Sequence, residues 1–498
     1  MTALTRAKPV RFIDAPFARA ADDFLAEHTA HFSVPGHKRN RLLVGDDPLL
    51  LADMPHLCGV DDMRLSRDLL GRSERLAAQA WGADHTLFSV SGSTHPNQAM
   101  CMAAGAPGDE VIVARTSHRS VYAGLVFAGL EPVWISPDLE PVTGLALGMP
   151  VERVERALVE HPRAKAVMLV EPSYLGLVSD ISAMVEAAHA HGVPLICDQA
   201  WGAHFAFHPA LPNCAVSLGA DAVVMSAHKT LTAFSQGAML HLSDRGFLDV
   251  DRTRACFESL LTTSASGAIY ASLDRTRALM EERGAALIDD ALRLADGFRE
   301  QIDGRYGARC HDAGVIAHRS VGGFDPLKLV VDLGATGADG FQVERDLRDD
   351  GVVLEFADST TLVPLLTIGD DERSVARLIS SLMRSLARWA GPATRQRMAT
   401  SSWRITPQSV LTLREAFFAP RQRVPWWRAA GRVSAEIVSP YPPGIPVLAP
   451  GELITRELVG ALRDDVSAGT RMAGASDPSL ETLVVVADDD TVSISRGR

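Results

Sequence analysis

Short apolar runs alternate with stretches of helical periodicity between about residues 75 and 260. The apolar runs are continuous, which is typical of strands that are buried on both faces. They lie at residues 85–90, 111–114, 166–170, 194–197 and 222–225. Helical spacing of apolar residues occurs between them, at residues 97–104, 121–130 and 181–190. This order predicts an α/β fold with a mainly parallel central sheet that helices cover on both faces.

The pattern changes on both sides of this region. Residues 1–60 are rich in Pro, His and Arg, and Pro35-Gly36 interrupts regular structure, so we expect an irregular arm. A long helix is predicted at residues 273–302. A second, smaller α/β pattern follows, with strands at residues 327–333, 352–355 and 362–368 and helices at 341–348 and 372–389. We therefore expect four parts: an arm (1–60), a large domain (61–310), a small domain (311–390) and a C-terminal domain (391–498).

Composition and charge exclude several classes of protein. Of the 498 residues, 47% are hydrophobic and 22% are charged, so the chain can bury a large core. The net charge of -12 argues against a nucleic-acid surface, which needs a basic face, and against an anionic membrane as partner. No apolar run is long enough to span a membrane, and no signal peptide is visible. The six cysteines show no metal-ligand spacing, so we expect no metal and a reduced, cytoplasmic protein.

Two charged residues follow the ends of predicted strands. Asp198 comes directly after the strand at 194–197, and Lys229 comes shortly after the strand at 222–225. Ligands of open α/β sheets bind outside the carboxyl ends of the strands. Burial there lowers the pKa of a lysine, and the neutral amine can attack an aldehyde. A carboxylate can keep a pyridine nitrogen protonated, so that the ring accepts electrons. Taken singly, Lys229 could be a surface lysine and Asp198 a turn cap.

Two further features precede these residues in the chain. Ser91-Gly92-Ser93-Thr94 joins a predicted strand to a helix, where backbone N–H groups and the helix dipole favour a phosphate. The hydroxyls of Ser93 and Thr94 add donors. His118 follows the strand at 111–114, and its imidazole could stack on an aromatic ring. Each feature is common by itself. Their succession along consecutive strand–helix units predicts a pyridoxal-phosphate (PLP) site, with Lys229 holding the cofactor as a Schiff base.

At this point the sequence resembles the ornithine/lysine/arginine decarboxylases, a family of fold-type-I PLP enzymes. The Schiff-base motif and the C-terminal motif are together quite specific. The resembling segments are residues 35–38, 91–94, 97, 118, 171–177, 198–204, 226–231, 236, 262–264, 271–274, 441–446 and 450–452. The sequence departs from the family pattern at His95-Pro96, Gln199, Ala265 and Gly267. These departures leave the substrate and the geometry near the phosphate open.

The resemblance implies an aspartate-aminotransferase-like fold and decarboxylation of a basic amino acid (arginine, lysine or ornithine) to an amine and carbon dioxide. It implies catalytic roles for Lys229, Asp198, His118 and His228, with a proton delivered by Lys229 or His228. The implied cofactor contacts are Ser93, Thr94, His118, Asp198, Ala200, Trp201, Ser226, His228 and Lys229. It also implies a homodimer with active sites between the subunits. The chain is too short for the N-terminal wing domain of larger members.

Several alternatives stay open at this level. A PLP aminotransferase would use the same lysine and aspartate, with an arginine such as Arg345, Arg348 or Arg373 on the substrate carboxylate. Oxygen-dependent chemistry on arginine would consume dioxygen, and a non-catalytic PLP-binding protein would show no turnover. The distal cation of a basic substrate is expected to meet a carboxylate. Glu355 and Asp358 are the candidates.

Overall fold

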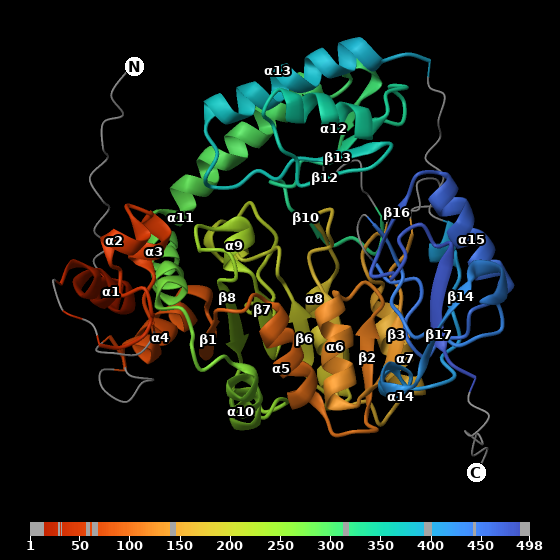
Figure 1. The fold of residues 1–498 in the computed structure, drawn as a ribbon, viewed down its shortest axis with the longest axis horizontal. Coiled ribbons are helices and arrows are strands. Elements are labelled where there is room, and N and C mark those ends of the chain that lie inside the picture. Colours follow the sequence, from red (N-terminus) through yellow and green to blue (C-terminus); the bar gives the residue numbers. More distant parts are fainter. Residues whose placement is uncertain are drawn as a thin grey trace.

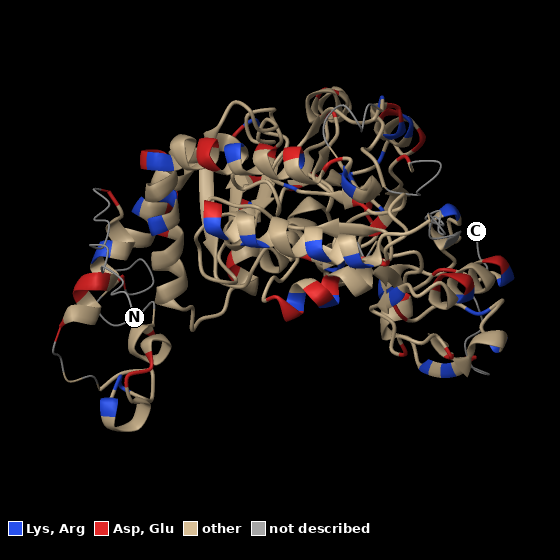
Figure 2. Cartoon of the chain, turned by 90° about the horizontal axis from the view of Figure 1, so that it is seen from above, with Lys and Arg blue, Asp and Glu red and all other residues tan. Residues whose placement is uncertain are grey.

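The structure is a computed structural model that describes residues 14–27, 30, 32–55, 60–61, 68–139, 146–311, 318–392, 401–441 and 445–488. Figure 1 shows a central sheet flanked by helices, with N-terminal helices at one end and the C-terminal part at the other. A small α/β unit covers the edge of the sheet that lies uppermost in this view. In Figure 2, Lys and Arg residues are interspersed with Asp and Glu residues along the helices. Within the described ranges, no helix is long and apolar enough to cross a membrane.

The central sheet has seven strands in the order β1-β8-β7-β6-β4-β2-β3. The five strands from β7 to β3 are parallel, and β8 runs antiparallel to both β7 and β1. The prediction of a mainly parallel sheet is confirmed, although the sequence pattern missed β3 and β8. The strands are β1 (His85–Ser89), β2 (Glu110–Ala114), β3 (Glu131–Ile135), β4 (Val167–Val170), β6 (Leu195–Asp198), β7 (Ala222–Met225) and β8 (Ala238–Leu242).

Helices bury both faces of this sheet, which explains the continuous apolar runs. In β2, Val111 and Val113 face one core, and Ile112 and Ala114 face the other. The first core includes residues of α5 (Thr94–Ala104), α6 (Arg119–Ala128) and α10 (Val250–Leu260). The second includes residues of α7 (Val151–Glu160), α8 (Ile181–Ala190) and the long helix α11 (Gly267–Ile302). The predicted start of helix α11 was residue 273, but the helix begins earlier, at Gly267.

The arm is not irregular throughout, so that prediction is wrong in part. It contains α1 (Pro16–Ala26), α2 (Arg41–Val44) and α3 (Pro48–Ala52). Helix α1 packs on α11 and on α4 (Leu69–Trp81). Its first N–H groups are satisfied from far away in the chain, because Asp274 Oδ2 accepts from the backbone of Phe17 at 3.0 Å and of Ala18 at 3.1 Å. A helix capped by a distant residue carries no local capping signal.

The small unit is built on a four-stranded antiparallel sheet of order β12-β13-β11-β9, covered by two helices. The predicted helices are confirmed as α12 (Gly340–Asp349) and α13 (Glu372–Trp389). The strand predicted at residues 352–355 is wrong, because pairing with β13 begins only at Phe356. A two-stranded pair, β5 (Leu177–Val178) with β10 (Gly323–Phe324), joins this unit to the large one. The four strands are β9 (Arg309–Cys310), β11 (Val331–Asp332), β12 (Phe356–Ala357) and β13 (Thr361–Val363).

The C-terminal part has its own apolar core, which includes Val438, Leu448, Leu458 and Leu483. Its elements are η4 (Ser401–Arg404), α14 (Leu413–Phe418), β14 (Arg421–Pro425), η5 (Trp426–Arg428), β15 (Ser439–Tyr441), α15 (Arg456–Ser467), β16 (Arg471–Ala473) and β17 (Thr482–Val486). The segment 441–446, which resembles the family's C-terminal motif, begins at the last residue of β15, and residues 442–444 lie outside the described residues. The four domain boundaries stay predictions.

Candidate active site

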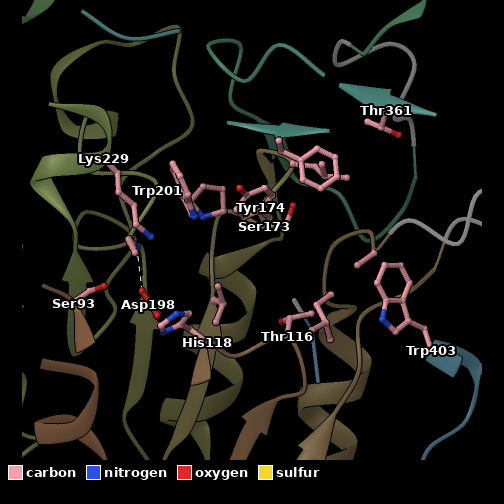
Figure 3. A pocket seen from close by; sticks show the side chains of 17 residues that line it. Ser93, Thr116, His118, Ser173, Tyr174, Asp198, Trp201, Lys229, Thr361 and Trp403 are labelled. Atoms are coloured by element: carbon pink, nitrogen blue, oxygen red, sulfur yellow. Dashed lines mark hydrogen bonds between the residues drawn. The ribbon is translucent and has the colours of Figure 1, made fainter. Parts of the chain in front are cut away.

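A pocket opens at the carboxyl ends of β4, β6 and β7, where the large unit, the small unit and the C-terminal part meet (Figure 3). It holds about 1020 Å³ of empty space, counting its open mouth. Lys229, Asp198 and His118 all line it, so the structure brings together the three residues that the sequence placed on separate strand ends.

Lys229 reaches the pocket from α9 (Ala227–Thr230), the short helix that follows β7. Its side chain points toward Asp198 (Figure 3), and its Nζ lies 4.3 Å from the ring centroid of Trp201. Burial lowers the pKa of the Lys229 amine, while the carboxylates of Asp198 and Glu355 act in the opposite direction. The amine is therefore easier to deprotonate than a surface lysine.

Asp198 is the last residue of β6 and is buried. Its carboxylate accepts hydrogen bonds from Asn97 Nδ2 at 2.7 Å and from the backbone N–H of Ala200 at 3.2 Å. Asn97, on α5, also donates to Ser120 Oγ at 3.1 Å. The resemblance grouped Asn97 with the phosphate turn, whereas here it fixes the Asp198 carboxylate. Two donors on one carboxylate hold it in place.

His118 is the N-cap of α6 and faces the same pocket. Its Nδ1 lies 2.8 Å from Ser120 Oγ, so the ring is tied to the residue that Asn97 also contacts. Loss of hydration in the pocket lowers the pKa of His118, against the nearby Asp198 carboxylate. The imidazole is thus favoured in its neutral form, which suits packing on an aromatic ring.

The predicted phosphate turn meets the lysine segment directly. Ser226 Oγ donates to Ser93 Oγ at 2.9 Å, and Gly92 takes the left-handed φ of 65° that the turn requires. His95, a departure from the family pattern, lies behind the turn. Its Nδ1 is 3.0 Å from Ser89 Oγ, and its Nε2 is 2.8 Å from the Phe257 carbonyl. Because Ser89 Oγ also donates to the Gly92 carbonyl, His95 braces the turn rather than obstructing it.

Three predicted contacts lie beside the pocket rather than in its wall. Ser226 and His228 are not among the lining residues, and burial lowers the pKa of His228, whose Nδ1 is 3.0 Å from the Gly237 carbonyl. Thr94 is exposed at the start of α5 and lines a neighbouring groove. Ala200 and Trp201 line the pocket, as predicted. The roles of all these residues stay predictions.

Sequence reasoning missed several residues of the pocket wall. Thr116 and Phe356 line it from the large and small units, and Trp403 and Ile445 line it from the C-terminal part. Ile445 lies in the C-terminal motif, which could have pointed to the site, but no local pattern marks Trp403. Among the residues that the structure covers, no group of His, Cys, Asp or Glu could hold a metal ion.

The arginines proposed for an aminotransferase lie elsewhere. Arg345 and Arg348 are on α12, where they contact Gln342 and Glu344, and Arg373 is exposed on α13. None of the three lines the pocket, and the described part of its wall contains no arginine.

The candidate carboxylates differ from each other. Tyr174 Oη donates to Glu355 Oε1 at 2.6 Å beside the pocket, whereas Asp358 accepts from the backbone of Thr360 and Thr361 within its own turn.

Comparison with known proteins agrees with this geometry. Residues 15–374 match the family described as "Orn/Lys/Arg decarboxylase, major domain", and residues 395–464 match the "Orn/Lys/Arg decarboxylase, C-terminal domain". An arginine decarboxylase of Bacillus subtilis (strain 168) is 31% identical over 96% of this chain and 99% of that protein. An arginine decarboxylase of Halalkalibacterium halodurans is 33% identical over 94% of this chain and 96% of that protein.

The fold is also similar to that of solved structures. The Francisella novicida lysine decarboxylase LdcF has a TM-score of 0.79 at 20% identity, over 95% of this chain and 81% of that chain. Lysine decarboxylase A from Pseudomonas aeruginosa has the same TM-score and identity, over 95% and 80%. Since the family match extends over most of the chain, and the relatives align along nearly their full length, the protein belongs to the ornithine/lysine/arginine decarboxylase family, whose reaction removes carbon dioxide from a basic amino acid.

Proposed function

We propose that this chain binds PLP on Lys229 and decarboxylates L-arginine to the corresponding amine and carbon dioxide. The observation that carries the proposal is the meeting of Lys229 and Asp198 in one pocket, from the ends of adjacent parallel strands. The pocket wall also lacks an arginine, in the part that the structure describes. A guanidinium beside the substrate carboxylate would hold that group as an ion pair and oppose its loss.

The residues present fit PLP. When bound, PLP supplies an aldehyde for the amino groups and a protonated pyridine ring that accepts electrons. Asp198, held by two donors, would face the ring nitrogen and favour its protonated form. Ala200 and His118 would enclose the ring, and Ser93 at the start of α5 would help to bind the phosphate. Lys229 would hold the aldehyde carbon.

The residues of the chain have separate roles in the reaction. Asn97 and the Ala200 N–H hold the Asp198 carboxylate in place, so that it would stay oriented toward the ring nitrogen. Lys229 Nζ, whose pKa is lowered by burial, can in its protonated form donate a proton to the α-carbon, where the proton takes the place of the departed carbon dioxide. His228 is less well placed for this transfer, since it lies beside the pocket wall. Trp201, Phe356 and Trp403 exclude water from the site.

Arginine as substrate is supported by the relatives named above and by the wall of the pocket. Apolar side chains such as Phe356 and Leu175 suit the aliphatic stem of a basic amino acid. Glu355 would meet the distal cation, because its carboxylate is exposed beside the pocket and oriented by Tyr174. A guanidinium could form two parallel hydrogen bonds with a carboxylate, which the single amine of lysine or ornithine cannot.

The first experiment asks whether PLP attaches to Lys229. Borohydride reduction of the protein with PLP, followed by peptide mass spectrometry, should place the modification on Lys229 and find none in Lys229→Ala. Lys165 is exposed, and the variant Lys165→Met is the matched control. Its Lys229 should be modified as in the wild type. Modification of other lysines alone, or of none, would contradict the proposal.

The second experiment is a substrate panel of L-arginine, L-lysine and L-ornithine, assayed for carbon dioxide, amine, keto acid and dioxygen consumption. We expect carbon dioxide and amine from arginine, with kcat/KM at least tenfold above the other two. Keto acid would indicate an aminotransferase, dioxygen consumption an oxidase, and binding without turnover a non-catalytic protein. Glu355→Gln should raise KM for arginine, whereas Glu344→Gln on the surface of α12 should not.

Two further expectations, a homodimer and a cytoplasmic location, stay predictions. Light scattering of the purified protein tests the first, and cell fractionation tests the second.

A further inference from the structure

Lys328 is a buried lysine next to the active site. It lies between β10 and β11, its side chain is fully buried, and its Nζ finds no acceptor among the residues that the structure covers. The Nζ lies 3.5 Å from the ring centroid of Trp201 and 5.2 Å from that of Tyr174. Burial of an ammonium group is costly unless charges or aromatic faces compensate it. A lysine retained in such a place calls for an explanation.

The packing around Lys328 holds its stem in place. Gly176 has a φ of +87°, and a Cβ there would lie 2.9 Å from Lys328 Cβ. Behind it, Asp325 Oδ2 lies 3.2 Å from His204 Nε2, and both residues are buried. The charged groups that act on Lys328 are Asp325, Glu355 and Lys229. Burial lowers the pKa of Lys328 to about 8, so the amine is mainly protonated at neutral pH.

Lysine is rare in this chain, which makes its use here informative. Only five of the 49 basic residues are lysines, at positions 8, 38, 165, 229 and 328. Two of these five lie on the same indole ring, since Lys229 Nζ is 4.3 Å and Lys328 Nζ 3.5 Å from the Trp201 centroid. An arginine would supply a cation for the ring equally well, but it cannot lose its proton. The amine of Lys328 can lose its proton.

The two amines are close enough to repel each other. They lie at most 7.8 Å apart, which is the sum of their two distances from the Trp201 centroid. Two positive charges at that separation, with an effective dielectric constant of about 20, shift each other's titration by about one to two pH units. Around Lys229, the carboxylates of Asp198 and Glu355 favour the protonated amine, while His118 and His228 are favoured neutral. The charge of Lys229 lowers the pKa of Lys328, and because this repulsion is mutual, an ammonium group at Lys328 acts against the two carboxylates at Lys229.

We propose that Lys328 is a positioning residue for Lys229: its ammonium fixes the Trp201 ring and, as a second positive charge, favours the unprotonated Lys229 amine that attaches PLP. This inference rests on the proposed attachment of PLP to Lys229. In that step the Nζ lone pair bonds to the aldehyde carbon, the two amine protons leave with the aldehyde oxygen as water, and a carbon–nitrogen double bond remains. An amine that already carries a third proton has no lone pair to begin the step.

The test measures PLP attachment to the cofactor-free protein, not turnover. Stopped-flow absorbance gives the attachment rate between pH 6 and pH 10 for the wild type, Lys328→Met and Lys328→Arg. We expect Lys328→Met to attach PLP about tenfold more slowly at pH 7, with its rate profile displaced upward by about one pH unit. Lys328→Arg keeps the charge and should match the wild type below pH 8. Lys165→Met controls for loss of a lysine elsewhere.

The outcomes separate this inference from the proposed function. A wild type that attaches no PLP contradicts the proposed function. A Lys328→Met profile that overlays the wild type overturns the inference, and so does an equal loss in Lys328→Arg, because shape rather than charge would then matter. If Lys328→Met does not fold, the comparison above pH 8 decides. There the wild type loses its second charge, so Lys328→Arg should attach PLP faster than the wild type, and an equal or slower rate refutes the inference.

Discussion

Replacing Glu452 with Gln should loosen the C-terminal part from the central sheet. Arg115, the residue that follows β2, forms a bidentate ion pair with Glu452, and both side chains are buried. Arg115 Nε also donates to the Pro446 carbonyl at 3.0 Å, next to Ile445 in the pocket wall. Glu452 Oε2 accepts a further bond from the Ala449 N–H at 2.7 Å. A glutamine would leave the Arg115 charge buried without a counter-ion.

The magnitude follows from burial. Breaking a buried ion pair by removing one partner costs about 3–5 kcal/mol, because the remaining charge is uncompensated. If the whole chain unfolds as one unit of 498 residues, its unfolding entropy of about 1 kcal/mol/K converts this cost into a fall in Tm of about 3–5 °C. If the C-terminal part unfolds separately, its much smaller entropy makes the shift of its own transition several times larger. Arg115→Met combined with Glu452→Met should recover most of the loss, since both charges are then gone.

Calorimetry at pH 7 and limited proteolysis would measure this effect, with Glu481→Gln as the matched control. Glu481 pairs with Arg463 in the same part of the chain, but the pair is solvent-exposed, and its loss should cost less than about 1 kcal/mol. Glu452→Gln should also lower kcat/KM, because Ile445 and the Thr116 segment share the pocket wall. A Tm for Glu452→Gln equal to that of Glu481→Gln would refute the reasoning.

Four further predictions concern the site and the buried Glu171 next to it in the chain. Asn97→Ala removes a hydrogen bond to the Asp198 carboxylate, and such a bond is worth about 1.5–3 kcal/mol. The kcat/KM of this variant should therefore fall roughly 10- to 150-fold while PLP still attaches. Asp198→Ala should attach PLP but lose most turnover. Burial raises the pKa of Glu171 from 4.5 to about 7, so the folded state loses stability as pH rises between these values. The Tm of Glu171→Gln relative to the wild type should therefore rise from pH 5 to pH 8; a constant difference would contradict this. Tyr174→Phe frees Glu355 and should raise KM for the basic substrate several-fold with little change in kcat.

The residues that sequence reasoning placed correctly all follow strands. Parallel strands end at the same edge of a sheet, so Asp198 and Lys229 had to lie near each other once β6 and β7 were neighbours. Hydrophobic runs are a local signal, and they located both strands within one residue at either end. The identity of the neighbours, however, depends on strand order, which the runs themselves do not contain.

The residues that were missed depend on contacts between distant segments. Asn97 and Asp198 are 101 positions apart, and only the packing of α5 beside β6 brings them within 2.7 Å. Asp274 accepts from the first N–H groups of α1 from 256 and 257 positions away, so the residue at the N-cap of α1 itself gives no side-chain cap. The short strand β12 was misplaced for a related reason, because two residues carry no periodicity and the pairing partner defines the strand.

This division between local and distant signals also separates the cofactor side of the pocket from the substrate side. Asp198 and Lys229 lie on strand ends, where geometry is set by the sheet and little can vary. Phe356, Trp403 and Ile445 come from the small unit and the C-terminal part, whose loops can change without disturbing that sheet. The chemistry of the reaction can thus stay constant while the wall that meets the substrate side chain diverges. Lys328 belongs to neither side: it comes from the small unit but acts on the cofactor lysine through Trp201.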